Sequence, residues 1–276
     1  MLSQAHTYHP FKLCDMSFSA TLFGTPGNWS LSQLKDPAAE EYRRRLGQVL
    51  LDLQVGRAFA TDTTTFNARL IEPGEFDYRV RVGNHMLLRA PDLPADGTSL
   101  LPGEAVVNSP AGCLVFVAAR PGQPPWVAHG GRWCFIDQHE VKYGSPDESR
   151  RDYSIVYAVM EKLRARRPDE VAEIEVAVFW SIPAQRFPHD RDDEKYGELN
   201  QSLYDHLCHA GMQDCMLERG SVFYPDLPRI LVHQFAARGV PIKNIDLTRA
   251  YLPPQGAHLD GSKGAPRNLA IIRRRS

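Results

Sequence analysis

The sequence predicts a single α+β domain in which mixed β-sheets are layered with helices. Segments with strand character and segments with helical character follow one another irregularly, without the repeating strand–helix–strand units of a doubly wound sheet. The 276 residues contain no internal repeat, low-complexity segment or Pro/Ser-rich linker. We therefore expect one domain spanning residues 1–276, which is long enough to bury a sizeable core.

The composition argues against several classes of partner. The formal net charge is −1 and 24% of the residues are charged, which indicates neither nucleic acid nor an anionic membrane as a ligand. The five cysteines are odd in number and form no C-x-x-C pair, so a disulfide framework and a four-thiolate zinc site are both disfavoured. No segment resembles a secretory signal or approaches the roughly 20 apolar residues of a membrane span. We expect a cytoplasmic protein that acts on a small molecule.

Helices are expected where apolar residues recur with a period of about 3.6 residues. The expected helices are one opened by Asp36-Pro37, one running from a cap at residues 145–149 to Pro168, and two over residues 198–209 and 228–238. Strands are expected where β-branched and aromatic residues alternate or cluster between turn residues. The expected strands are residues 59–66, 78–82, 105–107, 114–118, 126–128, 173–182, 240–247 and 268–272, with residues 91–103 as a loop.

The most informative stretch lies in the middle of the chain. The apolar runs 114–118 and 126–128 have strand character, and the Pro/Gly-rich residues 120–125 between them are typical of a turn. One run begins directly after Cys113 and the other ends directly before His129. Pairing of the two strands would bring this thiol and this imidazole together at one edge of a sheet. Such a pair is typical of metal ligands or of a nucleophile with its base; a buried thiol and a strand-end histidine are the structural alternative.

The usual motifs of several enzyme classes are absent from the sequence. It contains no phosphate-binding loop, dinucleotide fingerprint, zincin helix or serine-hydrolase elbow. His85, just after the predicted strand 78–82, adds a second imidazole to Cys113 and His129. Two imidazoles and one thiolate match a catalytic zinc site, whose fourth position stays open for water or substrate. Zinc at such a site lowers the pKa of its bound water towards ~7.

The order of several motifs resembles the laccase-domain family, whose members are also called multicopper polyphenol oxidoreductase-like proteins or peptidoglycan editing factors. The family core runs from a histidine through Ala-Asp-Ala or Ala-Asp-Gly to Ala-Asp-Cys, a strand, and His-Ala-Gly-Trp-Arg-Gly. This chain has in the same order His85, Ala95-Asp96-Gly97, Ala111-Gly112-Cys113, the strand 114–118 and His129-Gly130-Gly131-Arg132-Trp133. The pattern departs from the family at Gly112, which replaces an aspartate, and at Arg132-Trp133, where the order is reversed. The family's Phe-Phe-Ser-x-Arg-Arg stretch is not recognisable around residues 253–260.

The resemblance implies an α/β/β/α sandwich similar to that of cysteine hydrolases. It also implies one zinc ion held by His85, Cys113 and His129. Members of the family are described as purine nucleoside phosphorylases with adenosine deaminase activity. The expected activity is therefore that of a transferase or hydrolase acting on a purine nucleoside or a related small polar substrate, by phosphorolysis with phosphate or by deamination.

Three further side chains are expected at such a site. Arg132 and Arg267 are candidate anion binders, because guanidinium groups bind phosphate through two parallel hydrogen bonds. Arg132 is also a candidate catalytic residue, together with Cys113 and His129. Asp96 would orient a ligand histidine through its free ring nitrogen, or would only shape a turn.

Two other functions remain open from the sequence. In cysteine hydrolases of the glutamine-deamidase type, a small residue precedes the nucleophilic cysteine and a histidine follows on the next strand. Gly112-Cys113 and His129 resemble this pattern, and His129 would then generate the thiolate of Cys113 without a metal. The third possibility is a catalytically degenerate module that only binds a small molecule or a protein.

Overall fold

A seven-stranded sheet forms one half of the protein and is covered on one face by helix α1 (Glu40–Asp52). The computed structural model describes residues 7–24, 28–36, 39–61, 68–89, 95–110, 112–135, 154–253, 257 and 267–276. The strand order is β1-β2-β15-β7-β3-β5-β4. These strands are β1 (Thr7–Leu13), β2 (Met16–Phe23), β3 (Arg57–Ala60), β4 (Tyr78–Val82), β5 (His85–Arg89), β7 (Glu104–Asn108) and β15 (Leu269–Arg274). Leu46 and Leu50 of α1 are buried against this sheet.

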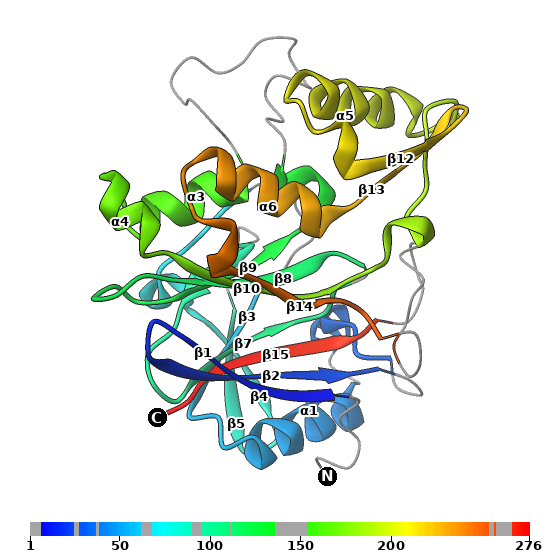
Figure 1. The fold of residues 1–276 in the computed structure, drawn as a ribbon. Helices are drawn as coiled ribbons and strands as arrows, with labels where there is room; N and C mark the ends of the chain where they lie inside the picture. The colour runs from blue at the N-terminus through cyan, green and yellow to red at the C-terminus, as the bar shows by residue number, and fades with distance from the viewer. Residues whose placement is uncertain are drawn as a thin grey trace.

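A five-stranded sheet of order β14-β10-β8-β9-β6 forms the other half. Its strands are β6 (Gly97–Ser99), β8 (Leu114–Ala119), β9 (Trp126–Gly130), β10 (Glu175–Ser181) and β14 (Ile245–Tyr251). Helices α3 (Ile155–Lys162) and α6 (Leu227–Ala237) cover its outer face. Figure 1 shows the resulting order of layers, with α1 below, the two sheets in the middle and α3 and α6 above. The expected α+β class and the α/β/β/α layering are confirmed.

Strand β8 explains why the middle of the chain is so apolar. Leu114 and Phe116 point to the core beneath α3 and α6, while Val115 and Val117 point to the core between the two sheets. Because both faces of the strand are covered, both sets of alternating side chains must be apolar.

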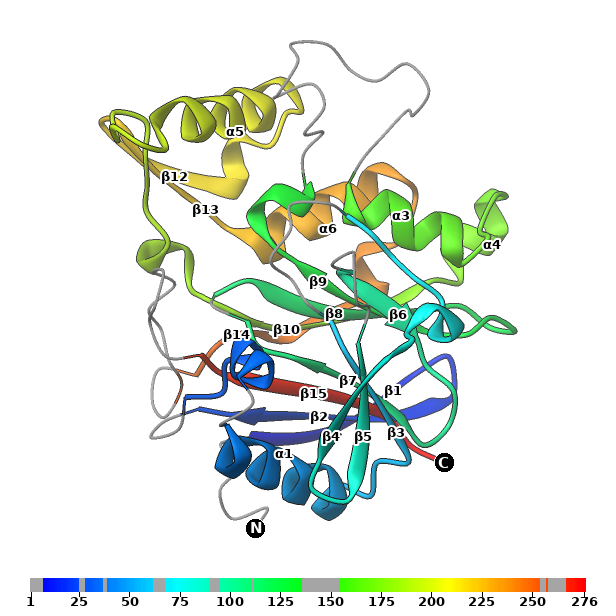
Figure 2. The same cartoon turned by 180° about the vertical axis from the view of Figure 1, so that it is seen from behind.

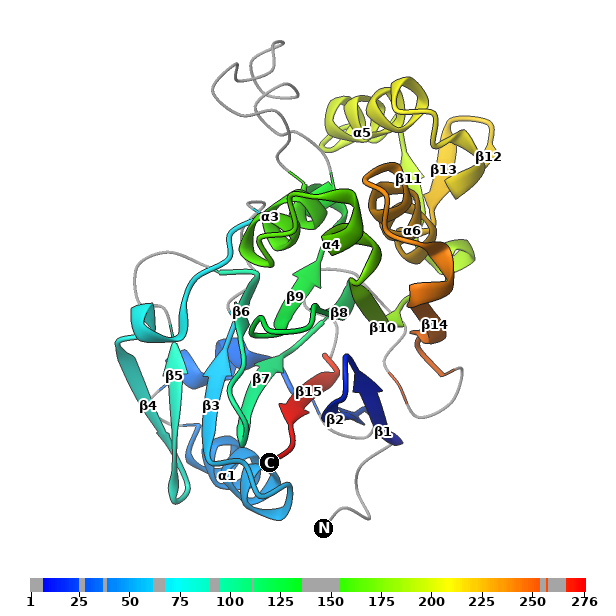
Figure 3. The same ribbon diagram turned by 60° about the vertical axis from the view of Figure 1, so that its left-hand side comes forward.

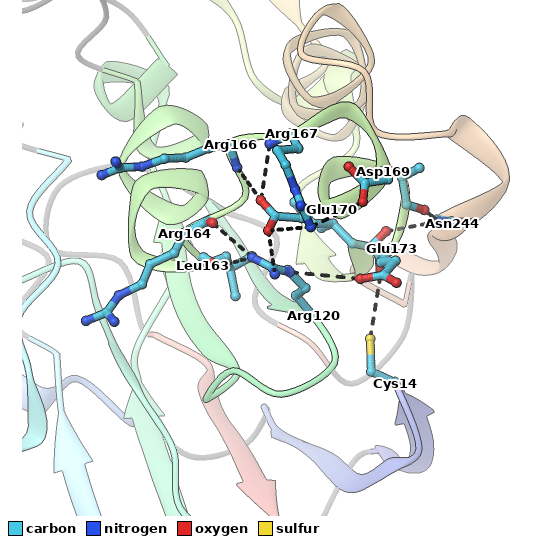
Figure 4. Close-up of polar contacts among 12 residues, drawn as sticks. Cys14, Arg120, Leu163, Arg164, Arg166, Arg167, Asp169, Glu170, Glu173 and Asn244 are labelled. Atoms are coloured by element: carbon cyan, nitrogen blue, oxygen red, sulfur yellow. Dashed lines mark hydrogen bonds and ion pairs between the residues drawn. The ribbon is translucent and has the colours of Figure 1, made fainter.

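The far end of the β8–β9 hairpin is held by Arg120, which directly follows β8. Its Nη1 donates hydrogen bonds to the carbonyl oxygens of Leu163, at 3.1 Å, and Arg164, at 2.9 Å. Its Nη2 lies 3.3 Å from Oε1 of Glu170 in α4 (Pro168–Ala172). Figure 4 shows the Arg120 guanidinium between the end of α3, at Leu163, and helix α4. These contacts fix the hairpin at the end opposite Cys113 and His129.

A smaller unit lies beside α6, as Figure 3 shows. It is a three-stranded sheet of order β11-β13-β12, with α5 (Gly197–His209) packed against it. Its strands are β11 (His189–Asp190), β12 (Met216–Arg219) and β13 (Val222–Pro225). Along the described ranges, no helix is long and apolar enough to cross a membrane.

Two helix boundaries differ from the expectation. Asp36 does not open α1 but ends the short 3-10 helix Leu31–Lys35, and α1 begins at Glu40. Ser154 is the N-cap of α3, because its hydroxyl accepts a hydrogen bond from the amide of Tyr157, and Pro168 begins α4 instead of ending α3. A proline suits the first turn of a helix because that turn leaves its amide groups unbonded in any case. Residues 37–38 and the expected cap at 145–149 lie outside the described residues.

Three strand expectations also change. The expected loop over residues 91–103 contains the short strand β6, which pairs with β9. Strand β14 begins only at Ile245, because residues 242–244 form a 3-10 helix. Strand β3 ends at Ala60, and residues 62–67 and 90–94 lie outside the described part of the chain.

Candidate functional site

The β8–β9 hairpin brings Cys113 and His129 together, as predicted. Val115 pairs with His129 and Leu114 pairs with Gly130, so Cys113 comes next along the same edge. Cys113 is half-buried, whereas His129 is buried. The thiol and the imidazole lie close enough for each group to shift the pKa of the other.

Asp96 lies on the other side of the imidazole. Strand β6 pairs with β9, and the amide of His129 donates a 2.7 Å hydrogen bond to the carbonyl oxygen of Asp96. The carboxylate oxygen Oδ1 lies 3.5 Å from Nδ1 of His129, and Oδ2 accepts a 3.1 Å hydrogen bond from the amide of Arg69. The side chain of Asp96 is only 1% exposed. Asp96 therefore orients the ring of His129 through Nδ1.

Cys134 is a fourth member of this cluster that sequence reasoning missed. It lies in the 3-10 helix Arg132–Phe135, directly after β9. Its Sγ donates a hydrogen bond to Oδ1 of Asp96 at 3.7 Å. Burial, together with the nearby Asp96 carboxylate, raises the pKa of Cys134 to about 11. Cys134 is therefore a protonated thiol at neutral pH.

Cys113 and His129 stabilise each other's charged form. Burial disfavours the Cys113 thiolate, but the positive charge of His129, and to a lesser extent Arg132, outweighs burial and lowers the pKa of Cys113. Burial also disfavours the imidazolium, but the Cys113 thiolate and the hydrogen bond to Asp96 raise the pKa of His129 well above its ordinary value. Contact between the two groups therefore favours the thiolate of Cys113 and the imidazolium of His129 over their neutral forms.

The same cluster has the donor atoms of a metal site. Potential ligand atoms of Asp96, His129 and Cys134 all lie within 4.8 Å of one another. Carboxylate oxygen, imidazole nitrogen and cysteine sulfur are all zinc ligands. A Cβ added at Gly131 would lie 3.2 Å from Cε1 of His129 and 3.8 Å from Sγ of Cys134, so the glycine keeps this space open. The three buried residues could therefore hold a metal ion.

His85 is not brought to this cluster. It begins β5, whose Leu87 pairs with Ala58 of the parallel strand β3, so His85 lies at the amino end of β3. Strand β7 is parallel to β3, and the chain continues from the carboxyl end of β7, at Asn108, to Cys113. His85 and Cys113 therefore lie towards opposite ends of these strands. Figure 2 shows the β4–β5 turn next to α1, at the other end of the sheet. The expected ligand set of His85, Cys113 and His129 is therefore not assembled.

Arg132 does lie at the site, and it contacts a residue that the sequence did not indicate. Its Nη1 lies 2.7 Å from Nε2 of His189 in strand β11. Nδ1 of His189 lies 2.9 Å from the carbonyl oxygen of Phe187, which can only accept a hydrogen bond. Nδ1 therefore carries the proton, and Nε2 accepts from Arg132. Burial, with a smaller effect of the Arg132 charge, lowers the pKa of His189 to about 3.

This low pKa predicts acid-dependent stability. As the pH falls below about 6.5, the unfolded chain binds a proton at His189 that the folded chain does not bind until pH 3. The stability present above the unfolded pKa is thus lost as the pH falls. Between about pH 7 and pH 5, the unfolding free energy of the parent should fall. The His189→Gln variant has no imidazole at this position, so its unfolding free energy should fall by about 2 kcal/mol less than that of the parent. Urea denaturation at both pH values measures this, and equal losses in the two proteins would contradict it.

Solved structures with the same fold cover nearly the whole chain. The hypothetical protein YfiH of Bacillus licheniformis is 12% identical, with a TM-score of 0.60 over 94% of this chain and 93% of that chain. YlmD from Geobacillus stearothermophilus is 18% identical, with a TM-score of 0.58 over 94% and 92%. Neisseria meningitidis NMB0706, a DUF152 protein, is 14% identical, with a TM-score of 0.59 over 98% and 99%. These three are laccase-domain, polyphenol oxidase-like proteins.

The chain has the laccase-domain fold. No protein-family model and no curated protein sequence matches it. At identities of 12–18%, the likeness establishes the laccase-domain fold alone, because one fold can carry unrelated activities.

The departure at Gly112 has a structural reason. Gly112 has a φ of +139°, which side-chain-bearing residues rarely adopt, and a Cβ there would lie 3.1 Å from Cγ2 of Ile182. The carbonyl oxygen of Gly112 accepts a 2.8 Å hydrogen bond from the amide of Ile182, which ties the residue before Cys113 to the end of β10. The aspartate of the laccase-domain motif does not fit this backbone. Ala111 lies outside the described residues.

Replacing Gly112 by the aspartate of the laccase-domain motif tests whether a side chain is strained at this position. We expect Gly112→Asp to lower the free energy of unfolding by about 1–3 kcal/mol, from the backbone conformation and the contact with Ile182. Gly220→Asp is the matched control, because Gly220 has a φ of +63° in open space and Asp tolerates this left-handed region. Thermal unfolding of the two variants should separate them; equal stability would show that residue 112 is unstrained.

Arg267 lies next to β15 in the seven-stranded sheet. Its amide donates a hydrogen bond to Oδ1 of Asn28, and its carbonyl oxygen accepts one from the amide of Trp29. Its backbone is thus tied to the segment after β2. Its expected role as an anion binder stays a prediction.

Proposed function

We propose that this chain is a cysteine-dependent enzyme in which Cys113 is the nucleophile, His129 its base and Asp96 the residue that orients His129. The observation that carries this proposal is the placement of one imidazole between a half-buried thiol and a buried carboxylate. A nucleophile, a base and an orienting group in this order are the requirements for covalent catalysis. Asp96 takes the Nδ1 side of the ring, which leaves Nε2 for proton exchange with Cys113.

The reaction class is acyl transfer on an amide or a related carbonyl compound. The Cys113 thiolate adds to the carbonyl carbon, and the imidazolium of His129 gives its proton to the departing ammonia or amine as the carbon–nitrogen bond breaks. Water then attacks the thioester, His129 removes a proton from it, and the sulfur leaves as thiolate while the acid is released. The substrate is a small polar molecule, and Arg132 and Arg267 are proposed to bind an anionic group on it.

A metal-dependent enzyme is the second candidate, favoured by the convergence of Asp96, His129 and Cys134. Zinc suits these donors and would supply Lewis-acid activation of water or substrate. The substrate would then be the purine nucleoside, with phosphate or water, that the family resemblance implies. All three donor residues are buried, whereas the neighbouring Cys113 is half-buried. A substrate would therefore approach the metal from the side of Cys113.

Metal content separates the two candidates. If a metal is held by Asp96, His129 and Cys134, elemental analysis should find about one zinc per chain, and Cys134→Ser should lose most of it. For the cysteine enzyme we expect a metal-free protein whose activity on amide substrates resists chelators and is abolished by Cys113→Ser. Cys215→Ser is the control for removal of a buried thiol away from the cluster. Stoichiometric zinc that depends on Cys134 would overturn the cysteine-enzyme proposal.

A further inference from the structure

We propose that Cys113 and Cys134 form a reversible disulfide when hydrogen peroxide reaches the site. Both side chains are free thiols in the structure. Cys134 takes no part in the acyl-transfer reaction proposed above, so the disulfide gives this buried thiol a role of its own. Formation of the disulfide is inferred from the positions of the two sulfur atoms, whereas its effect on activity rests on the proposed role of Cys113 as the nucleophile.

The backbone brings both cysteines next to Gly131. Leu114 pairs with Gly130 in the antiparallel β8–β9 hairpin, and the same register sets Cys113 across from Gly131. Residues that face each other in such a pair have Cα atoms about 4.5–5.5 Å apart. The amide of Cys134 donates a 2.9 Å hydrogen bond to the carbonyl oxygen of Gly131, which closes a tight turn. The Cα atoms at the two ends of such a turn lie less than about 7 Å apart.

The two sulfur atoms border one small space beside Gly131. A Cβ built on this glycine would lie 3.6 Å from Sγ of Cys113 and 3.8 Å from Sγ of Cys134. The sulfur atoms are therefore no further apart than the sum of these two distances. Cε1 of His129 lies 3.2 Å from the same point and forms a third side of the space. Since glycine has no side chain to fill it, rotation of the two cysteine side chains about their Cα–Cβ bonds is the movement that brings the sulfurs towards the bonding distance of about 2.05 Å.

The reaction with peroxide needs no other reactant. The sulfur of Cys113, the half-buried thiol, attacks one oxygen of hydrogen peroxide; the oxygen–oxygen bond breaks, water leaves and Cys113 becomes a sulfenic acid. The sulfur of Cys134 then attacks the sulfur of Cys113, and the hydroxyl group leaves as water with the thiol proton of Cys134. Two thiols are thus oxidised to one disulfide while one peroxide is reduced to water. The bonded sulfur of Cys113 cannot attack a carbonyl carbon, so acyl transfer would stop until a thiol reductant reopens the disulfide.

The test is peptide mapping of the purified protein after treatment with a chelator and hydrogen peroxide, with the remaining thiols blocked by N-ethylmaleimide under denaturing conditions. Trypsin cuts after Arg132, between the two cysteines, so their peptides stay joined only through a disulfide. We expect the Cys113–Cys134 pair as the principal oxidised product, with the number of free thiols falling from five to three. Cys14, which is half-buried between β1 and β2, is the internal control and should stay outside any disulfide.

Two variants separate a disulfide from simple oxidation of Cys113. In the parent, labelling of Cys113 by N-ethylmaleimide should be lost after peroxide and return almost completely with dithiothreitol. In Cys134→Ser, Cys113 should proceed to the sulfinic acid, so dithiothreitol should restore less than about half of its labelling, because thiols do not reduce a sulfinic acid. Gly131→Ala should slow disulfide formation about tenfold, since its methyl group fills the space beside the sulfurs and keeps them from bonding geometry. Gly74→Ala, whose methyl group would meet no atom within 4 Å, is the control.

The results that would overturn this inference differ from those that would overturn the proposed function. A folded, chelator-treated parent in which Cys134 stays a thiol after peroxide would overturn the disulfide alone. Equal recovery of Cys113 labelling in the parent and in Cys134→Ser would do the same. A Cys113→Ser variant that still hydrolyses amide substrates would instead contradict Cys113 as the nucleophile, and would leave the disulfide in the parent unaffected.

Discussion

Replacing His129 by alanine is expected to slow alkylation of Cys113 about 100-fold near pH 6.5, because an adjacent opposite charge shifts a thiol pKa by about one to three units. His129 supplies the principal interaction that lowers the pKa of Cys113 against the cost of burial. Without it, only the weaker effect of Arg132 would oppose burial, so much less thiolate would exist at this pH. The parent should show the opposite behaviour, with alkylation beginning below the pH range of an ordinary thiol.

Two comparisons make this experiment decisive. Cys134 is an internal reference, because its pKa of about 11 predicts almost no alkylation in the folded protein. Alkylation of the parent with and without a chelator distinguishes a free thiolate from a metal-bound one. A folded parent in which Cys113 stays inert under both conditions would mean a structural thiol, and the degenerate binding module would then be the correct alternative.

Adding a methyl group at Gly97 is expected to lower the free energy of unfolding by about 3 kcal/mol, since overpacking against a backbone costs roughly this much. A Cβ at this position would overlap the carbonyl oxygen of Val127 and lie 2.8 Å from Cα of Ala128. Strand β6 would have to move away from β9. That movement would carry the neighbouring Asp96 away from His129.

Gly47→Ala is the matched control for this prediction. A Cβ at Gly47 would overlap the carbonyl oxygen of Val82 and lie 2.8 Å from Cα of Gly83, where α1 meets the β4–β5 turn. We therefore expect a similar loss of stability in urea denaturation, without a change in the alkylation of Cys113. Both Gly97→Ala and Gly47→Ala should be compared at a temperature where both are folded. If they slow the alkylation of Cys113 equally, displacement of Asp96 is not the cause of the slower alkylation in Gly97→Ala.

The hairpin that carries the site could be predicted from local sequence alone. Two apolar runs joined by a Pro/Gly-rich turn allow one simple pairing, and that pairing sets Cys113 against His129 whatever surrounds it. Asp96 was also indicated, through a motif that the sequence shares with laccase-domain proteins. Its contact with His129 depends on strand β6, which is too short to be distinguished from a loop in the sequence.

The positions of three residues in the fold could not be predicted from the sequence: Cys134, His189 and His85. Cys134 looked like the other cysteines until the turn after β9 brought it to Asp96. His189 is 57 positions from Arg132, and no local pattern marks their contact. His85 stands in the right order along the chain, but order does not determine which end of a strand a residue occupies.

The α+β class, the continuous apolar strand at the centre and the thiol–imidazole pair could all be predicted from the amino-acid sequence, because they depend on periodicity and on residues joined by one short turn. The other groups that surround the thiol–imidazole pair are set by contacts between segments that are far apart in the chain. Strand register sent His85 to the far end of its sheet, while the packing of a separate three-stranded unit brought His189 to Arg132. Contacts between distant segments depend on the packing of whole layers, and that packing is a property of the folded chain rather than of any local pattern.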